Sequence, residues 1–148
     1  SLCTSALVMI TILSGAFVAG MDAGLIYNEF PKMGGKWIPP DLMAIVPKWR
    51  NFFENAVTVQ FDHRYLATFT VIVSTALALY SRRLPLPGHV KTAYTLLMGA
   101  AALQFTLGLC TLLMLAKTPI ASSHQFGATL LWTATVWLLH AIKRMPKL

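Results

Sequence analysis

The sequence predicts an all-α membrane protein: a bundle of four transmembrane helices. First, 56% of the 148 residues are hydrophobic and only 11% are charged, whereas soluble domains carry about 25% charged residues. Second, four apolar runs divide the chain, and each is long enough to cross a hydrocarbon core of ~30 Å. Third, the basic residues behind the net charge of +7 gather at the ends of these runs. Membrane topology requires that distribution, so we expect no nucleic-acid partner.

The predicted spans are joined by connections of very unequal length. We place the spans at residues 2–20, 59–80, 92–115 and 120–142, within one domain covering residues 1–148. Residues 21–58 form a long outer loop, whereas the other two connections are short. Within this loop, residues 48–56 follow Pro47 and fit either a short helix at the membrane surface or a polar loop with incidental aromatic residues.

The basic residues orient the bundle in the membrane. The 81–91 connection and the 143–148 tail together contain six Lys and Arg residues and no acidic residue. Positive charge in short segments favours the cytosolic or matrix side. The outer loop, which carries most of the acidic residues, then faces the periplasm or the intermembrane space.

A short repeat marks the second and fourth spans. Residues 63–68 read His-Arg-Tyr-Leu-Ala-Thr and residues 124–129 read His-Gln-Phe-Gly-Ala-Thr. Both spans run in the same direction through the membrane, and both histidines lie about one turn inside. The pattern indicates a helix pair repeated in parallel about an axis along the membrane normal.

His63 and His124 are the candidate metal ligands. Small residues follow each histidine at helical spacing, which leaves a slot between helices for a flat macrocycle with one imidazole on each side of its iron. The alternative is a transporter or scaffold bundle in which the histidines only pack. His140 lies 16 residues, or about 24 Å of helix, after His124, so it cannot share a haem with His63. We interpret His140, and His89 in its Pro-Gly connection, as surface residues, with a second haem on the inner side as the alternative.

Two charged residues flank the first candidate ligand. Arg64 can pair with a haem propionate, because arginine suits bidentate carboxylate binding, or it can anchor the span at the aqueous edge. Asp62 can fix the tautomer of an imidazole or pair with Arg64, and its adjacency to both residues prevents a choice.

Several motifs together resemble the C-terminal half of haem A synthase, over nearly the whole chain. They comprise residues 15–20 (Gly-Ala-Phe-Val-Ala-Gly), 22–24, 27–28, 30–33 (Phe-Pro-Lys-Met), 51–55 (Asn-Phe-Phe-Glu-Asn), 60–64 (Gln-Phe-Asp-His-Arg) and 123–125 (Ser-His-Gln). The residues of these motifs are most similar to those of the mitochondrial branch of that family.

The resemblance implies a function and a larger architecture. Members have eight spans in two pseudo-symmetric halves and oxidise the C8 methyl of haem O to a formyl group, which gives haem A for cytochrome c oxidase. The C-terminal half would hold haem b between His63 and His124, with Arg64 as a further haem contact. The expected location is the mitochondrial inner membrane, multi-pass, or the plasma membrane of a bacterium. The expected partners are membrane lipid, the N-terminal half of the same protein, haem O, an electron donor such as a ferredoxin, and, as an open alternative, further copies in a homo-oligomer.

One departure from the family pattern bears on catalysis. The N-terminal half of the family carries a glutamate three residues before its first histidine, where this chain has Gln60. An amide cannot act as a carboxylate base, and iron with two histidine ligands has no open axial position for oxygen. We therefore expect no catalytic residue here and an electron relay that is inactive alone. The alternative is a stand-alone bis-histidine b-type cytochrome subunit.

Overall fold

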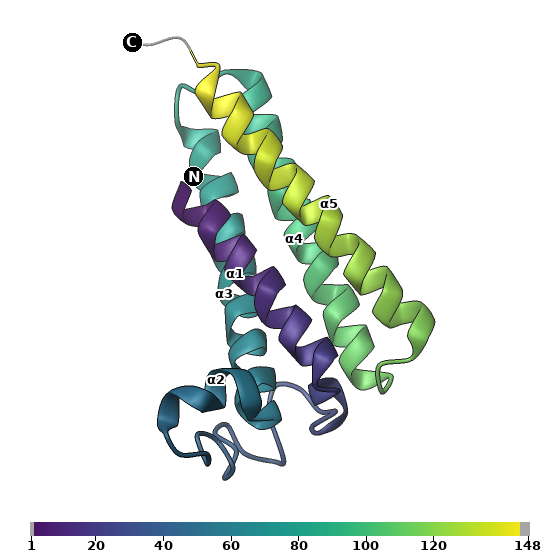
Figure 1. Ribbon diagram of the computed structural model, residues 1–148. Coiled ribbons are helices and arrows are strands. Elements are labelled where there is room, and N and C mark those ends of the chain that lie inside the picture. Colours follow the sequence, from purple (N-terminus) through teal and green to yellow (C-terminus); the bar gives the residue numbers. More distant parts are fainter. Residues whose placement is uncertain (1, 146–148) are drawn as a thin grey trace.

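The computed structural model describes residues 2–145, and these residues form an all-α bundle with a folded loop region at one end (Figure 1). Its long helices are α1 (Leu2–Gly20), α3 (Ala56–Arg83), α4 (Gly88–Leu113) and α5 (Thr118–Lys143). Each predicted span coincides with one of these helices. Residues 146–148 of the predicted basic tail lie outside the described residues.

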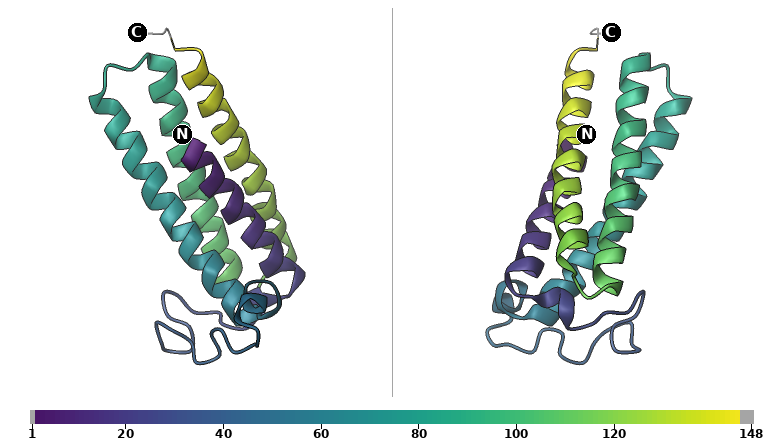
Figure 2. Two further views of the ribbon diagram at one scale, coloured as in Figure 1. Left: turned by 60° about the vertical axis from the view of Figure 1, so that its left-hand side comes forward. Right: turned by 90° about the vertical axis from the view of Figure 1, so that its right-hand side faces the viewer.

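The long helices are arranged as a ring. α1 packs against α3 and α5, and α4 packs against the same two helices, so α3 and α5 lie diagonally opposite each other. α1 and α4 run towards the loop region, whereas α3 and α5 run away from it (Figures 1 and 2). The helices that carry the two histidines are therefore parallel, as the repeat predicts.

The second span is longer than predicted at both ends. α3 begins at Ala56 because the Asn55 side chain caps it, accepting hydrogen bonds from the backbone N–H groups of Val57 and Thr58. It ends at Arg83 because Leu84 precedes a proline, which disfavours helical backbone. The histidine of this helix consequently lies about two turns from its start and not one.

The connections between helices also differ from the prediction. α4 begins at Gly88, directly after Pro87, so most of the predicted 81–91 connection is helical and only residues 84–87 link α3 to α4. At its other end, α4 stops at Leu113. Leu115 and Ala116 then adopt left-handed φ values of 58° and 50° and reverse the chain into α5.

Three of the described helices, α1, α3 and α4, are long and apolar enough to cross a membrane. The fourth long helix, α5, is not among them. Its first half carries a polar run, residues 122–125 (Ser-Ser-His-Gln), which lowers the hydropathy of the helix. The prediction of a fourth span is therefore not confirmed by composition.

The apolar core lies towards the end of the bundle that is remote from the loop region. It joins α1, α4 and α5, and its fully buried members are Val8, Val90, Ala93, Leu97, Ala101, Leu131, Leu138 and Ala141. Most come from the first half of α4 and the second half of α5. The helices are thus packed together at one end, which leaves the loop end to hold a cavity.

The outer loop is organised around Asn51, whose side chain is fully buried. Its amide exchanges hydrogen bonds with both backbone groups of Ile45, donates to the carbonyl of Lys48 and accepts from Asn55. The loop contains two 3₁₀ turns, Ala23–Leu25 and Lys48–Arg50, and the short helix α2 (Asn51–Glu54). The helical alternative for this segment is thus correct over residues 48–54.

Candidate functional site

A cavity of about 620 Å³ occupies the loop end of the bundle, between all four long helices. Its walls are mostly apolar, and its volume is in the range of small-molecule and cofactor sites, ~300–1,000 Å³. His63 of α3 and His124 of α5 both line it. The structure therefore brings the two predicted ligands to one cavity from diagonally opposite helices. Their role as ligands stays a prediction.

Each imidazole lies against a glycine of a neighbouring helix. A Cβ atom on Gly15 of α1 would be 2.8 Å from Cε1, 3.4 Å from Nε2 and 3.5 Å from Nδ1 of His63. A Cβ atom on Gly108 of α4 would be 2.9, 3.4 and 3.5 Å from the same atoms of His124. Both rings are therefore held in the same way, and neither position has room for a side chain.

The two rings differ in their polar contacts. His63 Nδ1 lies 2.8 Å from Ser14 Oγ, and the Ser14 hydroxyl donates to the carbonyl of Thr11. One turn before Ser14 in α1, Thr11 Oγ1 lies 2.8 Å from Thr70 Oγ1. This contact links α1 to α3 within the cavity wall. His124 Nδ1, in contrast, is buried and has no close hydrogen-bond partner among the described residues, although its ring interacts with the backbone of Gln104.

Unpartnered buried polar atoms gather around this cavity. The described residues contain five such side-chain atoms, and four belong to residues that line the cavity. They are Gln60 Oε1, Arg64 Nε, Gln104 Oε1 and His124 Nδ1. Because a buried polar group without a partner costs about 1–3 kcal/mol, this clustering indicates that a bound molecule or water completes the site. With the two glycine-backed imidazoles, these residues fit a haem.

Arg64 fastens the outer loop over the mouth of the cavity. Its Nη1 atom donates to the carbonyls of Glu29, at 2.7 Å, and Lys32, at 3.2 Å, and its Nη2 atom donates to the carbonyl of Tyr27 at 2.6 Å. The neighbouring Gln60 Nε2 donates to the same Tyr27 carbonyl. Two of the five N–H groups of Arg64 remain uncommitted, that of Nε and one of Nη2, so any contact with a haem propionate is restricted to these two donors.

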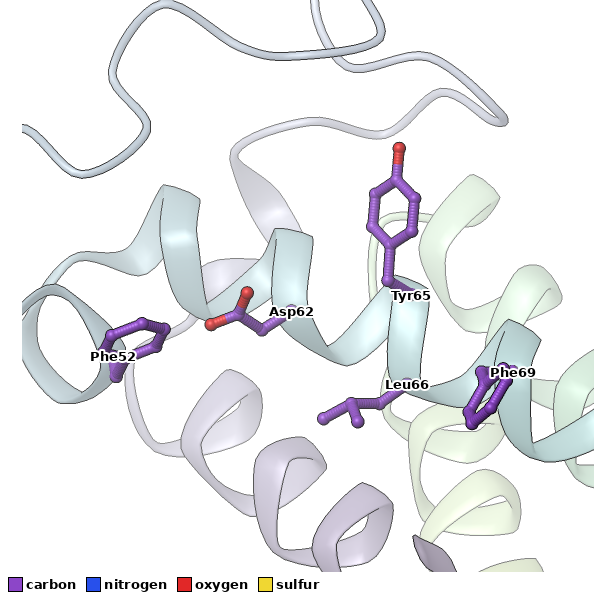
Figure 3. Close-up of a pocket in the computed structure, with 5 residues that line it drawn as sticks. All are labelled: Phe52, Asp62, Tyr65, Leu66 and Phe69. Carbon is purple, nitrogen blue, oxygen red and sulfur yellow. The ribbon is translucent and has the colours of Figure 1, made fainter.

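Asp62 has neither of the roles considered from the sequence. Its carboxylate lies in a shallow outer hollow and points towards the ring of Phe52 of α2, whereas the His63 ring lines the interior cavity (Figure 3). Among the described residues, no hydrogen bond or ion pair reaches this carboxylate. Adjacent residues on a helix point about 100° apart, which explains why Asp62 misses the imidazole. Ser14, and not Asp62, is the side chain that contacts the His63 imidazole.

The remaining ionisable candidates lie away from the cavity. His89 and His140 are exposed, as expected for surface residues. Glu54 is exposed at the end of α2, where Arg50 donates two hydrogen bonds to its carboxylate and lowers its pKa.

Four residues of the site were missed from the sequence: Ser14, Gly15, Gln104 and Gly108. Their signal is weak, because each is an ordinary residue of an apolar helix. Ser14 and Gly15 could be assigned to the site only if the face of the helix that packs against a histidine were known.

Comparisons with known proteins identify the family of the chain. A family model described as "Cytochrome oxidase assembly protein" (COX15-CtaA) matches residues 1–136. The chain is 51% identical to "Heme A synthase COX15" of Homo sapiens over 144 residues, 97% of this chain and 35% of that protein. It is 50% identical to "Heme A synthase" of Nitrosospira multiformis over 140 residues, 95% of this chain and 39% of that protein. No solved structure matches.

The relatives also bear on location and extent. The chain spans about a third of the length of the curated relatives that it matches. Such relatives occur in mammals and in bacteria, and with three apolar helices the chain is a multi-pass protein of the mitochondrial inner membrane or of a bacterial plasma membrane. The relatives named above are heme A synthases, and the match over most of its length shows that this chain belongs to the COX15-CtaA family.

Proposed function

We propose that this chain is the C-terminal, haem b-binding half of a haem A synthase, and that it relays electrons to the reaction that converts haem O to haem A. One observation carries the proposal. Two histidines from diagonal helices line one cavity, and each is backed by a glycine in matching geometry. The glycine lets each ring lie against the backbone of the neighbouring helix and line the cavity at the same time, and the matched arrangement of the two rings on opposite sides of one cavity supports a shared ligand.

Different residues of the chain would bind the haem iron, close the cavity and contact a haem propionate. His63 and His124, whose rings line the cavity, would hold the iron of the haem. Arg64 and Gln60 hold the outer loop over the mouth, which limits access of water and of oxygen. The uncommitted Arg64 Nε provides one donor, beside a permanent positive charge, for a propionate. Haem bound by two histidines supplies a one-electron carrier without an open axial position.

Two further features support the C-terminal half. Gln60 stands where the N-terminal half of the family has a glutamate, and its amide donates to a backbone carbonyl of the loop, which is a structural task. The paired Gly–His contacts of α1 with α3 and of α4 with α5 also support a repeated helix pair. We extend the proposal to α5 as a fourth span, because His124 and Gln125 of its polar run line the cavity.

The whole protein would supply what this chain lacks. We propose that its other half binds haem O and provides the acid-base group, and that an electron donor such as a ferredoxin reduces the haem of this half. We propose that lipid surrounds the bundle. Self-association into a homo-oligomer is a further proposal, which the mass of the purified protein would test.

The test is the haem content of the full-length protein that contains this chain. His63→Ala and His124→Ala should each remove one low-spin haem b per chain, whereas His140→Ala, an exposed histidine on α5, should retain it. If both cavity variants keep the full low-spin spectrum, the assignment is wrong. A complete protein that binds haem b and never forms haem A would instead indicate the stand-alone cytochrome.

A further inference from the structure

Each imidazole of the cavity also meets the residue four positions before its backing glycine. The ring of His63 interacts with the backbone of Thr11, and the ring of His124 interacts with the backbone of Gln104. Four residues are about one helical turn, so each ring lies against two successive turns of its neighbour, α1 or α4. The repeat therefore extends to the helices that support the histidines, and it makes Thr11 and Gln104 equivalent.

The side chains at these two equivalent positions make different contacts. Thr11 Oγ1 lies 2.8 Å from Thr70 Oγ1 of α3. Gln104 reaches the main chain of α5 instead, where its Nε2 atom donates a 2.8 Å hydrogen bond to the carbonyl of His124. A carbonyl accepts only from the nitrogen side of an amide, so this contact determines how the Gln104 amide is turned. Gln104 thus contacts the ring of His124 with its backbone and the backbone of His124 with its side chain.

Gly127 of α5 provides the space for this amide. A Cβ atom on Gly127 would overlap Gln104 Oε1 and would lie 3.4 Å from its Cδ. Gly127 comes three residues after His124, and the residue three positions after His63 is Leu66. The repeat therefore combines a short threonine with a leucine in one half and a long glutamine with a glycine in the other. This is the relationship expected of two positions that share one space.

We propose that Gln104 is a positioning residue for His124, and that Gly127 is required for it because any side chain there would displace the amide. The hydrogen bond holds the main chain of α5 at the histidine, and the backbone of α4 meets the ring, so α4 determines how the imidazole enters the cavity. This inference rests on the proposed haem-binding function. It deepens that function by assigning the residues that support one of the two ligands.

The orientation of the ring can be measured in the ferric, haem-loaded protein. The electron paramagnetic resonance spectrum of a low-spin haem with two histidine ligands depends on the angle between the two ring planes. In the full-length protein, Gln104→Met keeps approximately the size of the side chain and removes its N–H donor. It should shift the g values of the signal that disappears in His124→Ala. Gly127→Ala should shift the same signal, whereas Thr106→Ala, an exposed position of α4, should not.

The shared space can be tested in the haem-free protein by thermal unfolding. Alanine favours a helix more than glycine does, so the effect of Gly127→Ala is compared between two backgrounds. With Gln104→Ala the added methyl group has room and should raise the unfolding midpoint. In the unmodified protein it displaces the amide, so it should lower the midpoint or raise it less. Gly99→Ala, which meets nothing within 4 Å, should have the same effect in both backgrounds.

A measurement on the rings without haem separates this inference from the haem proposal. In the full-length protein labelled with ¹⁵N-histidine, Gln104→Met should shift the ring resonances of His124, assigned through His124→Ala, and leave those of His63 in place. Unshifted His124 resonances, or equal effects of Gly127→Ala in both backgrounds, would overturn the inference. If Gln104→Met does not fold, the same ring measurement on Gly127→Ala decides. A protein that shows the expected shifts but binds no low-spin haem would refute the proposed function alone.

Discussion

Gly15 and His63 are in such close contact that a single added methyl group on the glycine would lie 2.8 Å from the imidazole. Gly108 and His124 repeat the relationship at 2.9 Å. These are backbone-to-ring contacts between neighbouring helices, so a larger residue must displace either the ring or the helix. The position of each candidate ligand is thus determined by the absence of a side chain on the adjacent helix.

Gly15→Ala and Gly108→Ala should each impair haem binding by moving one imidazole. Overpacking of this kind typically costs about 1–3 kcal/mol, and ~1.4 kcal/mol corresponds to a tenfold change in affinity. We expect haem affinity, measured by titration of the haem-free protein, to fall by about tenfold or more, with loss of low-spin character.

The matched control for this pair is Gly99→Ala, on α4. A Cβ atom there meets nothing within 4 Å, so affinity should stay unchanged. Equal effects of Gly99→Ala and Gly108→Ala would indicate a general loss of helix flexibility and would remove the steric explanation.

Arg64→Lys should loosen the outer loop although it preserves the charge. The guanidinium donates to three backbone carbonyls at once, whereas a lysine ammonium is a compact point charge that cannot reproduce this planar arrangement. Amide hydrogen exchange across residues 27–32 should become faster. Arg50→Lys, which alters an exposed ion pair with Glu54, should leave the exchange of that segment unchanged. Unchanged protection in Arg64→Lys would show that other contacts hold the loop.

Asn51→Ala should destabilise the outer loop more than any exposed substitution in it. The change removes the partner of the backbone groups of Ile45 and of the carbonyl of Lys48, which lie in a partly buried setting. A fully buried group without a partner costs about 1–3 kcal/mol, and these partly buried groups cost less. A lower thermal unfolding midpoint is expected for Asn51→Ala, and almost no shift for Glu54→Gln in the adjacent exposed pair. Similar midpoints for the two variants would contradict the central role of Asn51.

The existence of the long helices was predictable from the sequence. Their ends were predicted for α1, which has the expected bounds, but not for α3, α4 and α5. Apolar runs determine where a chain can cross lipid, so each predicted span coincides with a long helix. The ends depend on single residues instead. The Asn55 side chain starts α3 three residues before the predicted boundary, and a cap of this kind adds nothing to hydropathy.

The two histidines of the candidate site could be proposed from the sequence, but their neighbours in the site could not. His63 and His124 were recognisable because ionisable residues are rare in spans and because the surrounding pattern repeats. Their neighbours come from other helices, and which faces meet depends on packing. Asp62 illustrates the limit: it is adjacent to His63 in sequence, yet it lies in an outer hollow with Phe52. Ser14, 49 residues away, contacts the ring.

The orientation of the bundle can be tested by labelling. The outer loop and the α3–α4 connection lie at opposite ends of the bundle (Figure 1). With both native cysteines, Cys3 and Cys110, replaced by serine, a cysteine at Gly35 should react with an impermeant reagent from the periplasm or the intermembrane space. A cysteine at Gly88 should react from the opposite side. Neither glycine has a neighbour within 4 Å of an added Cβ atom, so both substitutions are tolerable in space, although φ of +72° at Gly35 adds some strain. The reverse pattern would overturn the orientation drawn from the basic residues.

The last prediction concerns where oxidation of the haem O methyl group takes place. Gln60 is buried, its amide N–H donates to the carbonyl of Tyr27, and its Oε1 atom has no partner. An amide so placed can hold the loop and accept a hydrogen bond, but it cannot remove a proton as a carboxylate does. In the full-length protein, Gln60→Ala should therefore reduce haem A formation far less than His63→Ala, and mainly through the loosened loop.

The chain expressed alone extends the same argument. It should bind haem b and yet form no haem A from haem O with reductant and oxygen, while the full-length protein does so under the same conditions. Asp62 lies in the outer hollow and Glu54 pairs with Arg50 at the surface, so neither replaces the missing base, and Asp22 is the carboxylate that lines the cavity. Product analysis by chromatography and mass spectrometry would decide. Haem A, or its hydroxylated precursor, formed by the isolated chain would make this cavity the substrate site and His63 and His124 part of the catalytic centre.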